Sequence, residues 1–221
     1  MDVLAIQTRL KALGFNPGPL DGDPGPQTAR AVLAFERSKG LAPDGRIDQA
    51  MVSALFAGLD FKEPPWLTAA RKDLGIREGV GAADNPLVVK MFAEAGHPEI
   101  KHDSVAWCAA AVGAWLKRAG IKGTGSLWAL DYMKWGVPLP GPILGAIAVK
   151  KRQGGGHVTF VVGASSGRVF CLGGNQSDSV SIAAYDASVF AYRWPAGVRI
   201  PSPALPLPKT ISGARAGVSE T

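Results

Sequence analysis

Cys108 is the residue of this chain best placed for nucleophilic chemistry. The stretch around it, DSVAWCAAAVGAWLKRAG, predicts a buried helix over residues 105–119 with the cysteine near its start. The partial positive charge of a helix N-terminus favours the thiolate and lowers a cysteine pKa from about 8.5 to roughly 3.5–7.5. Backbone N–H groups at the same end can hold an oxyanion. A cysteine on an apolar helix is more often a packing residue, so the interpretation of Cys108 as a nucleophile depends on finding a base.

His157 is the best candidate for that base among the three histidines of the chain, His97, His102 and His157. It follows three glycines, which allow a substrate to approach closely, and it begins the strand-like run HVTFVVG. Asn175 follows the next such run, in GGNQSDS, and its amide is suited to hold the imidazole in one tautomer; Asp178 is the alternative third group. The chain order cysteine, histidine, asparagine is that of the papain-like peptidases.

Two other chemistries have weaker support. GASSG at residues 163–167 matches the G-x-S-x-G pattern of serine hydrolases, but Ser165 lies between two strand-like runs and no histidine follows it, which favours a hairpin turn. Zinc ligands are available in His97 and His102 with His157 or a cysteine, but HPEIKH is a proline-containing loop without the spacing of a helical zinc motif. We therefore expect no metal and no other cofactor.

Several acidic and aromatic residues near the cysteine are candidates for supporting roles. A lysozyme-type mechanism needs two placed carboxylates; Glu78, Glu94 and Asp103 are available, but no local pattern selects a pair. Asp103 is expected to cap the cysteine helix or to contact substrate, with capping favoured, and Glu78 to line a cleft or to lie at a solvated helix end. Trp107 is expected to pack or to form a wall of the substrate groove, and Gln176 to contact the substrate.

Residues 1–58 are predicted to form a compact all-α unit of three helices. Apolar residues recur at helical spacing in VLAIQTRLKALG at 3–14, in PQTARAVLAFERSKG at 26–40 and in IDQAMVSALF at 47–56. A glycine ends each of the first two helices, and turns containing Asp-Gly separate the segments.

The rest of the chain is predicted to contain an α+β domain over residues 66–200. A linker at 59–65 precedes it, and a flexible Pro-, Ser- and Gly-rich tail with little packing follows at 201–221. Helices are expected at 66–79 and 85–96, before the cysteine helix. Strand-like runs then follow between turn residues, which favours helices packed on an antiparallel sheet. The runs are GAIAVKK, HVTFVVG, RVFCLGG, SVSIAAY and VFAYRWP.

The net charge of +6 comes from the middle of the chain, since residues 1–60 carry 6 Lys or Arg and 7 Asp or Glu while residues 61–200 carry 16 and 10. A basic domain favours an anionic partner such as a wall polymer or anionic lipid, although a solvated face explains it equally well. The basic residues are not interleaved with aromatic ones, so nucleic acid binding is not indicated. Cys108 and Cys171 give no disulfide framework, and Cys171 alternates with apolar residues like a buried strand residue.

The turn and helix residues between Asp21 and Leu55 resemble the peptidoglycan-binding module found at the ends of many cell-wall hydrolases. The pattern DG-x-x-GPQT-x-x-A-V-x-x-F, followed by GL-x-x-DG and AL, lies within residues 3–57. The sequence departs from it at residues 47–49, where many relatives have a Gly and a Thr in a loop. The resemblance implies that this unit binds peptidoglycan.

A second group of motifs resembles the CHAP/NlpC-type cysteine amidases and endopeptidases, and more narrowly a phage and prophage branch. The motifs are WCAAAVGAWLKRAG, GTGS, GHVTFVVG, LGGNQSDSVSI and YRWP, over residues 66–195. The resemblance implies a papain-like domain with Cys108 as nucleophile, His157 as general base and Asn175 as the residue that orients it. Ala111 stands where the family usually has Phe, which is expected to change packing and not chemistry.

The two resemblances together imply a monomeric peptidoglycan hydrolase of the endolysin type, which cleaves an amide bond of the peptide stem and contacts the anionic envelope electrostatically. MDVLAIQTRL has neither the basic region nor the apolar core of a secretory signal, so we expect the protein in the host bacterial cytoplasm, acting after release across the inner membrane. Amidase and endopeptidase cleavage stay open. A non-catalytic wall-binding or phage structural protein, and a secreted effector with the same chemistry, are the alternatives.

Overall fold

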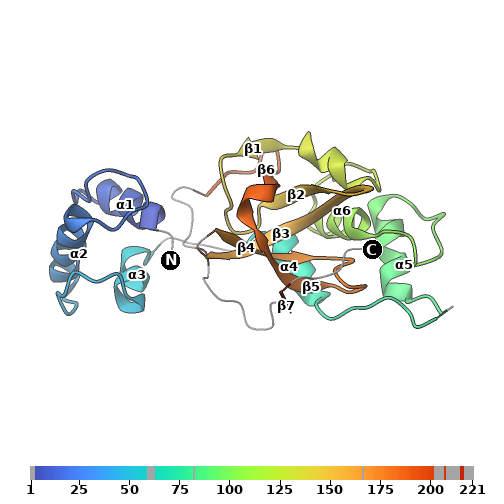
Figure 1. Cartoon of the computed structure of the whole chain (residues 1–221), viewed down its shortest axis with the longest axis horizontal. Coiled ribbons are helices and arrows are strands. Elements are labelled where there is room, and N and C mark those ends of the chain that lie inside the picture. Colours follow the sequence, from blue (N-terminus) through green and yellow to red (C-terminus); the bar gives the residue numbers. More distant parts are fainter. Residues whose placement is uncertain are drawn as a thin grey trace. The chain divides into compact units, whose positions relative to one another are not determined.

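The computed structural model describes residues 3–58, 63–81, 83–165, 167–201, 207 and 215–216. These residues fall into two compact units, one of residues 3–58 together with Pro201, and one of residues 63–200 together with Leu207 and residues 215–216. Figure 1 labels the helices and strands of each unit. Each unit has a buried apolar core of its own.

The first unit consists of three helices around one small core. They are α1 (Val3–Ala12), α2 (Pro26–Lys39) and α3 (Gln49–Leu55). Each helix turns one apolar face toward the other two, because its apolar residues recur every three or four positions. The side chains of the shared core that are most completely buried include Ile6, Leu10, Val32, Phe35, Met51 and Leu55.

Local residues fix the ends of these helices. Pro26 is the first residue of α2, where its missing N–H group would have had no helical partner. Gly40 ends α2 in the left-handed conformation, with φ 66°. Asp48 caps α3, because its side chain accepts a hydrogen bond from the Met51 N–H group.

The second unit is built on a sheet whose strand order, in the described residues, is β1-β6-β2-β3-β4-β5-β7. Strands β2 to β5 follow one another as antiparallel neighbours, and β6 returns to lie between β1 and β2. β7 pairs with β5 in parallel. The strands are β1 Val137–Leu139, β2 Ile147–Arg152, β3 Gly155–Ser165, β4 Arg168–Gly173, β5 Ser181–Asp186, β6 Phe190–Trp194 and β7 Arg215–Ala216.

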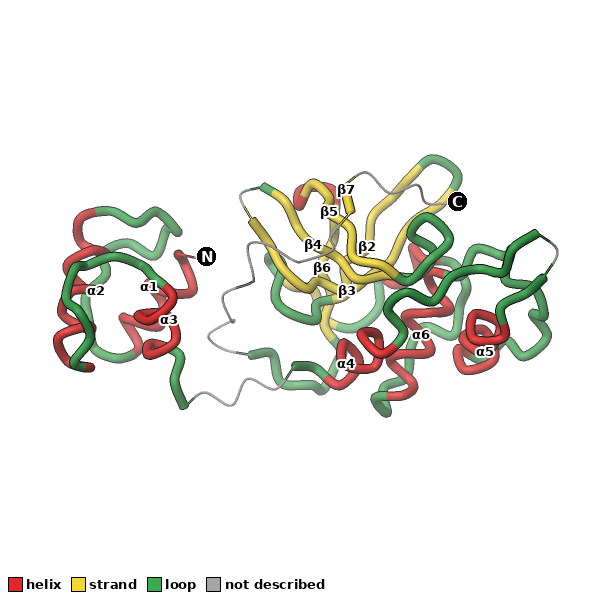
Figure 2. Tube along the Cα trace, turned by 90° about the horizontal axis from the view of Figure 1, so that it is seen from below, coloured by secondary structure: helices red, strands yellow, loops and turns green. Residues whose placement is uncertain are grey.

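Three helices lie on one side of this sheet, as Figure 2 shows: α4 (Pro65–Lys72), α5 (Pro86–Ala95) and α6 (Cys108–Arg118). α6 is central to the core, since every residue from Cys108 to Leu116 is buried. The Trp115 ring lies 5.7 Å from the Phe160 ring on β3. Two short 3₁₀ helices complete the unit, η1 (Ala129–Met133) and η2 (Ala187–Val189).

A second apolar cluster lies on the other face of the strands, because successive side chains of a strand alternate between faces. It contains Val161, Cys171 and Tyr192. Cys171 is fully buried there, as the alternation in the sequence predicts, and it forms no disulfide with Cys108. No helix in the described part of the chain has both the length and the apolar character needed to cross a bilayer.

The structure confirms helices at the N-terminus followed by a C-terminal antiparallel sheet. The helix expected over 66–79 is shorter, because α4 ends at Lys72 and the following residues pair with the 178–180 segment. This pairing consists of hydrogen bonds from Gly75 N to Val180 O, from Val180 N to Ile76 O and from Glu78 N to Asp178 O. The helix expected over 105–119 begins later than predicted, so that Cys108 is its first residue.

Much of the predicted linker and tail lies outside the described residues, namely residues 59–62, 202–206, 208–214 and 217–221. Pro65, the last residue of the predicted linker, is the first residue of α4. Leu207 is buried in the second apolar cluster, and Arg215–Ala216 forms β7. The prediction of little packing in the tail is wrong at these two points, where the open edge of β5 offers backbone groups for pairing.

Candidate active site

Cys108 is the first residue of α6 and is 5% exposed. The residue before it, Trp107, occupies the N-cap position with φ −117° and ψ 9°. An indole cannot accept a hydrogen bond, so this side chain does not cap the N–H groups of the first turn. The thiol therefore lies at the positive end of the helix dipole, the environment that favours a thiolate.

Asp103 does not cap this helix, which corrects the sequence-based expectation. A cap must directly precede the helix, and α6 begins five residues after Asp103. The Asp103 carboxylate is 5% exposed and accepts hydrogen bonds from the backbone N–H groups of Gly79 and Asn85, each at 2.7 Å. Its own N–H group donates to the Asp84 carboxylate. Asp103 thus holds the segment that leads from Glu78 to α5.

Glu78 connects that segment to the start of α6. Its carboxylate accepts a hydrogen bond from the Trp107 indole N–H group, and its backbone N–H group donates to Asp178 O. Partial burial raises the pKa of Glu78 above its ordinary value, the Trp107 hydrogen bond opposes this, and the Asp178 and Asp103 carboxylates add to it. Trp107 is fully buried, so it is a packing residue and not an exposed wall of a groove.

The turn after β4 packs directly on the first turns of α6. A Cβ atom at Gly174 would lie 2.5 Å from a carbon of the Trp107 ring and 2.7 Å from the Ala111 Cβ atom. Only glycine fits this contact, and a side chain larger than alanine at 111 would displace the turn. Asn175 and Asp178 both have left-handed backbones, with φ 55° and 54°, a conformation that Asn and Asp tolerate better than most residues.

The same turn holds the imidazole of His157. His157 Nε2 lies 3.2 Å from Gln176 Oε1, and the two side chains are 1% and 0% exposed. The Gln176 amide nitrogen donates to Ser181 O at 2.6 Å, so the amide oxygen is the atom that faces the ring. A neutral His157 then carries its proton on Nε2, which leaves Nδ1 as the basic nitrogen.

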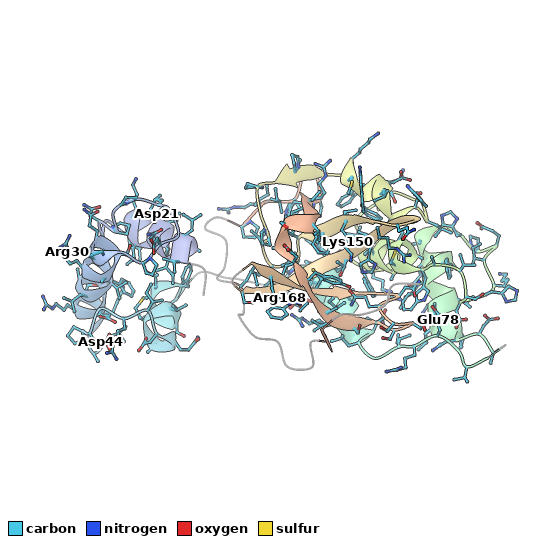
Figure 3. All side chains as sticks on the ribbon, viewed as in Figure 1. Asp21, Arg30, Asp44, Glu78, Lys150 and Arg168 are labelled. Carbon is cyan, nitrogen blue, oxygen red and sulfur yellow. The ribbon has the colours of Figure 1, made fainter. Side chains whose placement is uncertain are left out.

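Gln176 is therefore bonded to the histidine, and its contact with substrate stays a prediction. Its amide oxygen also accepts a hydrogen bond from the Tyr185 hydroxyl at 2.8 Å. Lys150, which Figure 3 labels, lies opposite His157 in the β2–β3 register. Its ammonium group is 4.4 Å from the centre of the Tyr185 ring. Tyr185 and Ser181 carry no local sequence signal, because they meet Gln176 only through the pairing of β4 with β5.

The turn after β4 thus links the residues predicted to be catalytic. Cys108 begins the helix, Gly174 touches the residue before it, Asn175 follows Gly174 in the turn and is 4% exposed, and His157 binds the next residue of the turn. The arrangement provides a thiol at a helix N-terminus and an oriented imidazole, the two groups that nucleophilic catalysis of acyl transfer requires.

The alternative chemistries do not gain support. Ser165 is the last residue of β3 and pairs with Arg168 of β4, as expected for a hairpin. His97 is bonded to Glu99 and to a backbone carbonyl, and the exposed His102 is bonded to Asp84. Within the described residues, no group of three or more His, Cys, Asp and Glu side chains is placed to hold a metal ion.

A second candidate site lies in the first unit, around the buried side chain of Gln7. Its amide oxygen accepts the Gly22 N–H group, and its amide nitrogen lies within 3.1 Å of oxygens of Asp21, Asp23 and Thr28. These bonds fix the turn before α2, and Figure 3 labels Asp21 and Arg30 there. A cavity of about 480 Å³ lies beside these bonds, lined by Gln7, Pro17, Pro19, Asp21, Asp23, Gly25, Pro26, Gln27, Thr28 and Arg30.

Comparison with known proteins assigns this unit. Residues 1–55 match the family described as "Putative peptidoglycan binding domain". The first unit is a peptidoglycan-binding domain. The chain is also 48% identical over 44 residues to N-acetylmuramoyl-L-alanine amidase CwlM of Mycobacterium tuberculosis. That stretch is 20% of this chain and 11% of the amidase, so the chain spans a small part of this relative. No solved structure is significantly similar to the chain.

Glu78 gives the site a measurable pH dependence. Its raised pKa means that the folded state favours the protonated carboxyl of Glu78 over the charged carboxylate. The stability that the protonated group contributes is complete below the ordinary pKa of 4.5 and is lost as the pH rises through the raised pKa. Glu78→Gln keeps an oxygen for the Trp107 indole and carries no charge. We expect the melting temperature of this variant, relative to the original protein, to increase between about pH 4 and about pH 7.

Glu99 provides the matched control, because hydrogen bonds from its own backbone N–H group and from His97 lower its pKa. Glu99→Gln should therefore lose stability relative to the original protein as the pH rises over the same range. Calorimetric melting curves of the three proteins measure both effects. A difference between Glu78→Gln and the original protein that does not change with pH would contradict the assigned pKa shift.

Proposed function

We propose that the protein is a peptidoglycan hydrolase whose first unit binds the wall and whose second unit cleaves an amide bond of the peptide stem with Cys108 as nucleophile. The observation that carries the proposal is the turn after β4, which packs on the residue before Cys108 and holds His157 through Gln176. A papain-like fold for the second unit is part of the same proposal. The similarity to a wall amidase agrees with this substrate class.

In the proposed mechanism His157 Nδ1 accepts the proton of the Cys108 thiol, and the thiolate attacks the carbonyl carbon of the amide. Backbone N–H groups of the first turn of α6 stabilise the negative oxygen of the tetrahedral intermediate. The imidazolium then donates its proton to the leaving amine as the C–N bond breaks. Water, deprotonated by His157, hydrolyses the thioester and restores the thiol, so no cofactor is consumed.

The peptidoglycan-binding domain contributes by holding the second unit near its substrate. Attachment to the wall turns each later cleavage into a reaction at a high effective concentration. The net positive charge of residues 61–200 adds attraction to anionic envelope polymers, and this contribution falls as salt is added. We propose a monomeric endolysin that is made in a bacterial cytoplasm, with no nucleic acid partner.

A second candidate function is wall binding without catalysis, as in a phage structural protein. It is favoured by the comparisons, since the family match ends at residue 55 and the similarity to the amidase covers 44 residues. A secreted wall-degrading effector would share the chemistry of the first proposal and differ in where the protein acts.

Digestion of purified peptidoglycan separates these functions. We expect the original protein to release soluble fragments whose masses identify the cleaved bond, and Cys108→Ala to release none. Cys171→Ala is the matched control: this cysteine is buried in the second apolar cluster, and the variant should retain activity. Equal digestion by the original protein and Cys108→Ala would exclude the cysteine mechanism, and no digestion by either would favour the binding protein.

The role of Gln176 is tested against that of Asn175. Gln176→Ala should lose a large part of the roughly 10²–10⁴-fold contribution of a general base to kcat/KM, whereas Asn175→Gly, which suits the left-handed backbone, should lose little. Gln176→Glu places a carboxylate beside the imidazole and should move the acidic limb of the pH–rate profile to higher pH. If Asn175→Gly is the more damaging variant and Gln176→Glu leaves the profile unchanged, Asn175 is the orienting residue.

A further inference from the structure

A cavity of about 440 Å³ is lined by residues of α5 and α6 and by the residues that follow each of these helices. Figure 2 shows α5 beside α6. The residues after α6 and the 3₁₀ helix η1 close the cavity. The lining is dominated by small residues, which leave backbone atoms accessible. It consists of Glu94, Ala95, Gly96, Ala109, Gly113, Lys117, Gly120, Ile121, Lys122, Gly123, Gly125, Ser126 and Tyr132.

The Tyr132 hydroxyl is the unusual group of this cavity. The side chain is 0% exposed, and its oxygen has no hydrogen-bond partner among the described residues. It lies against Gly113 and Gly123, both of which line the cavity, while the nearby Thr124 hydroxyl is bonded to Ser126. Burial raises the pKa of Tyr132 to about 12 and outweighs the lowering effect of the neighbouring Thr124, whose contact with the hydroxyl does not have hydrogen-bond geometry, so the hydroxyl stays protonated at neutral pH. A buried hydroxyl without a partner is rare, and it indicates a place for a ligand polar group.

The rim of the cavity is positively charged. Lys117 and Lys122 are exposed, and neither forms an ion pair within the part of the chain that the structure describes. The acidic residue of the lining, Glu94, is already paired with Arg118 at 2.6 Å. An anionic group is therefore the ligand chemistry that this rim favours, and a carboxylate accepts hydrogen bonds from both ammonium groups.

Ala109, which directly follows Cys108, lines the cavity, so the cavity lies along the helix that begins with the candidate nucleophile. We propose that this cavity binds the end of a peptide that carries a free carboxylate, with the carboxylate between Lys117 and Lys122 and a peptide polar group at the Tyr132 hydroxyl. The volume suits a dipeptide. This inference rests on the proposed function and names its substrate class, stem peptides with a free terminal carboxylate.

Binding is measured on the full chain with Cys108→Ala, so that cleavage does not interfere. The probes are N-acetyl-L-alanyl-D-alanine and the same peptide as its C-terminal amide, followed by NMR titration. We expect the free acid to bind about tenfold more tightly than the amide, and added Lys117→Gln with Lys122→Gln to abolish that preference. Lys151→Gln, an exposed lysine on β2, is the matched control and should leave the preference intact.

Tyr132→Phe separates a binding role from a structural one. Loss of an unpartnered hydroxyl should leave the melting temperature unchanged or higher, yet weaken binding of both probes by about threefold or more. Equal binding of the acid and the amide, no binding of either, or unchanged affinity in Tyr132→Phe would overturn the proposal. The binding test involves no catalysis. Its result therefore does not depend on whether the protein digests peptidoglycan.

Discussion

The buried side-chain amide of Gln176 is the interaction on which the rest of the candidate site depends. Its oxygen faces His157 Nε2 and the Tyr185 hydroxyl, and its nitrogen is bonded to Ser181 O. The amide is 0% exposed, so a substitution that removes either end leaves a buried polar group without a partner. Through these bonds one side chain joins β3, the turn after β4 and β5, and fixes which imidazole nitrogen carries the proton in the neutral ring.

The turn that carries Gln176 packs directly on α6. Gly174 lies against Trp107 and Ala111, and residues 75–78 pair with the far end of the turn. Trp107 is in turn bonded to Glu78 in that pairing segment. The helix start, the turn and the segment after α4 therefore support one another, which is the kind of rigid surrounding that a catalytic constellation needs.

Much of the fold could be predicted from the sequence, because it depends on periodic apolar residues and local caps. The strand-like runs correspond to β2 to β6, and Gly40 ends α2 as its position indicates. Residues whose roles depend on distant contacts could not be predicted. Asp103 binds N–H groups of Gly79 and Asn85, and Gln176 meets Tyr185 across the sheet, and neither contact has a local signature. The β1 and β7 edge strands are too short for a periodic pattern.

Activation of the thiol by His157 is tested by the pH dependence of alkylation of Cys108 by iodoacetamide in the original protein and in His157→Ala, with the buried Cys171 as internal reference. We expect the alkylation rate of Cys108 in the original protein to be near its maximum already at about pH 7, and His157→Ala to move the rise in rate toward the ordinary cysteine pKa of about 8.5. Identical profiles in the two proteins, or a Cys108 as unreactive as Cys171, would contradict activation of the thiol by His157.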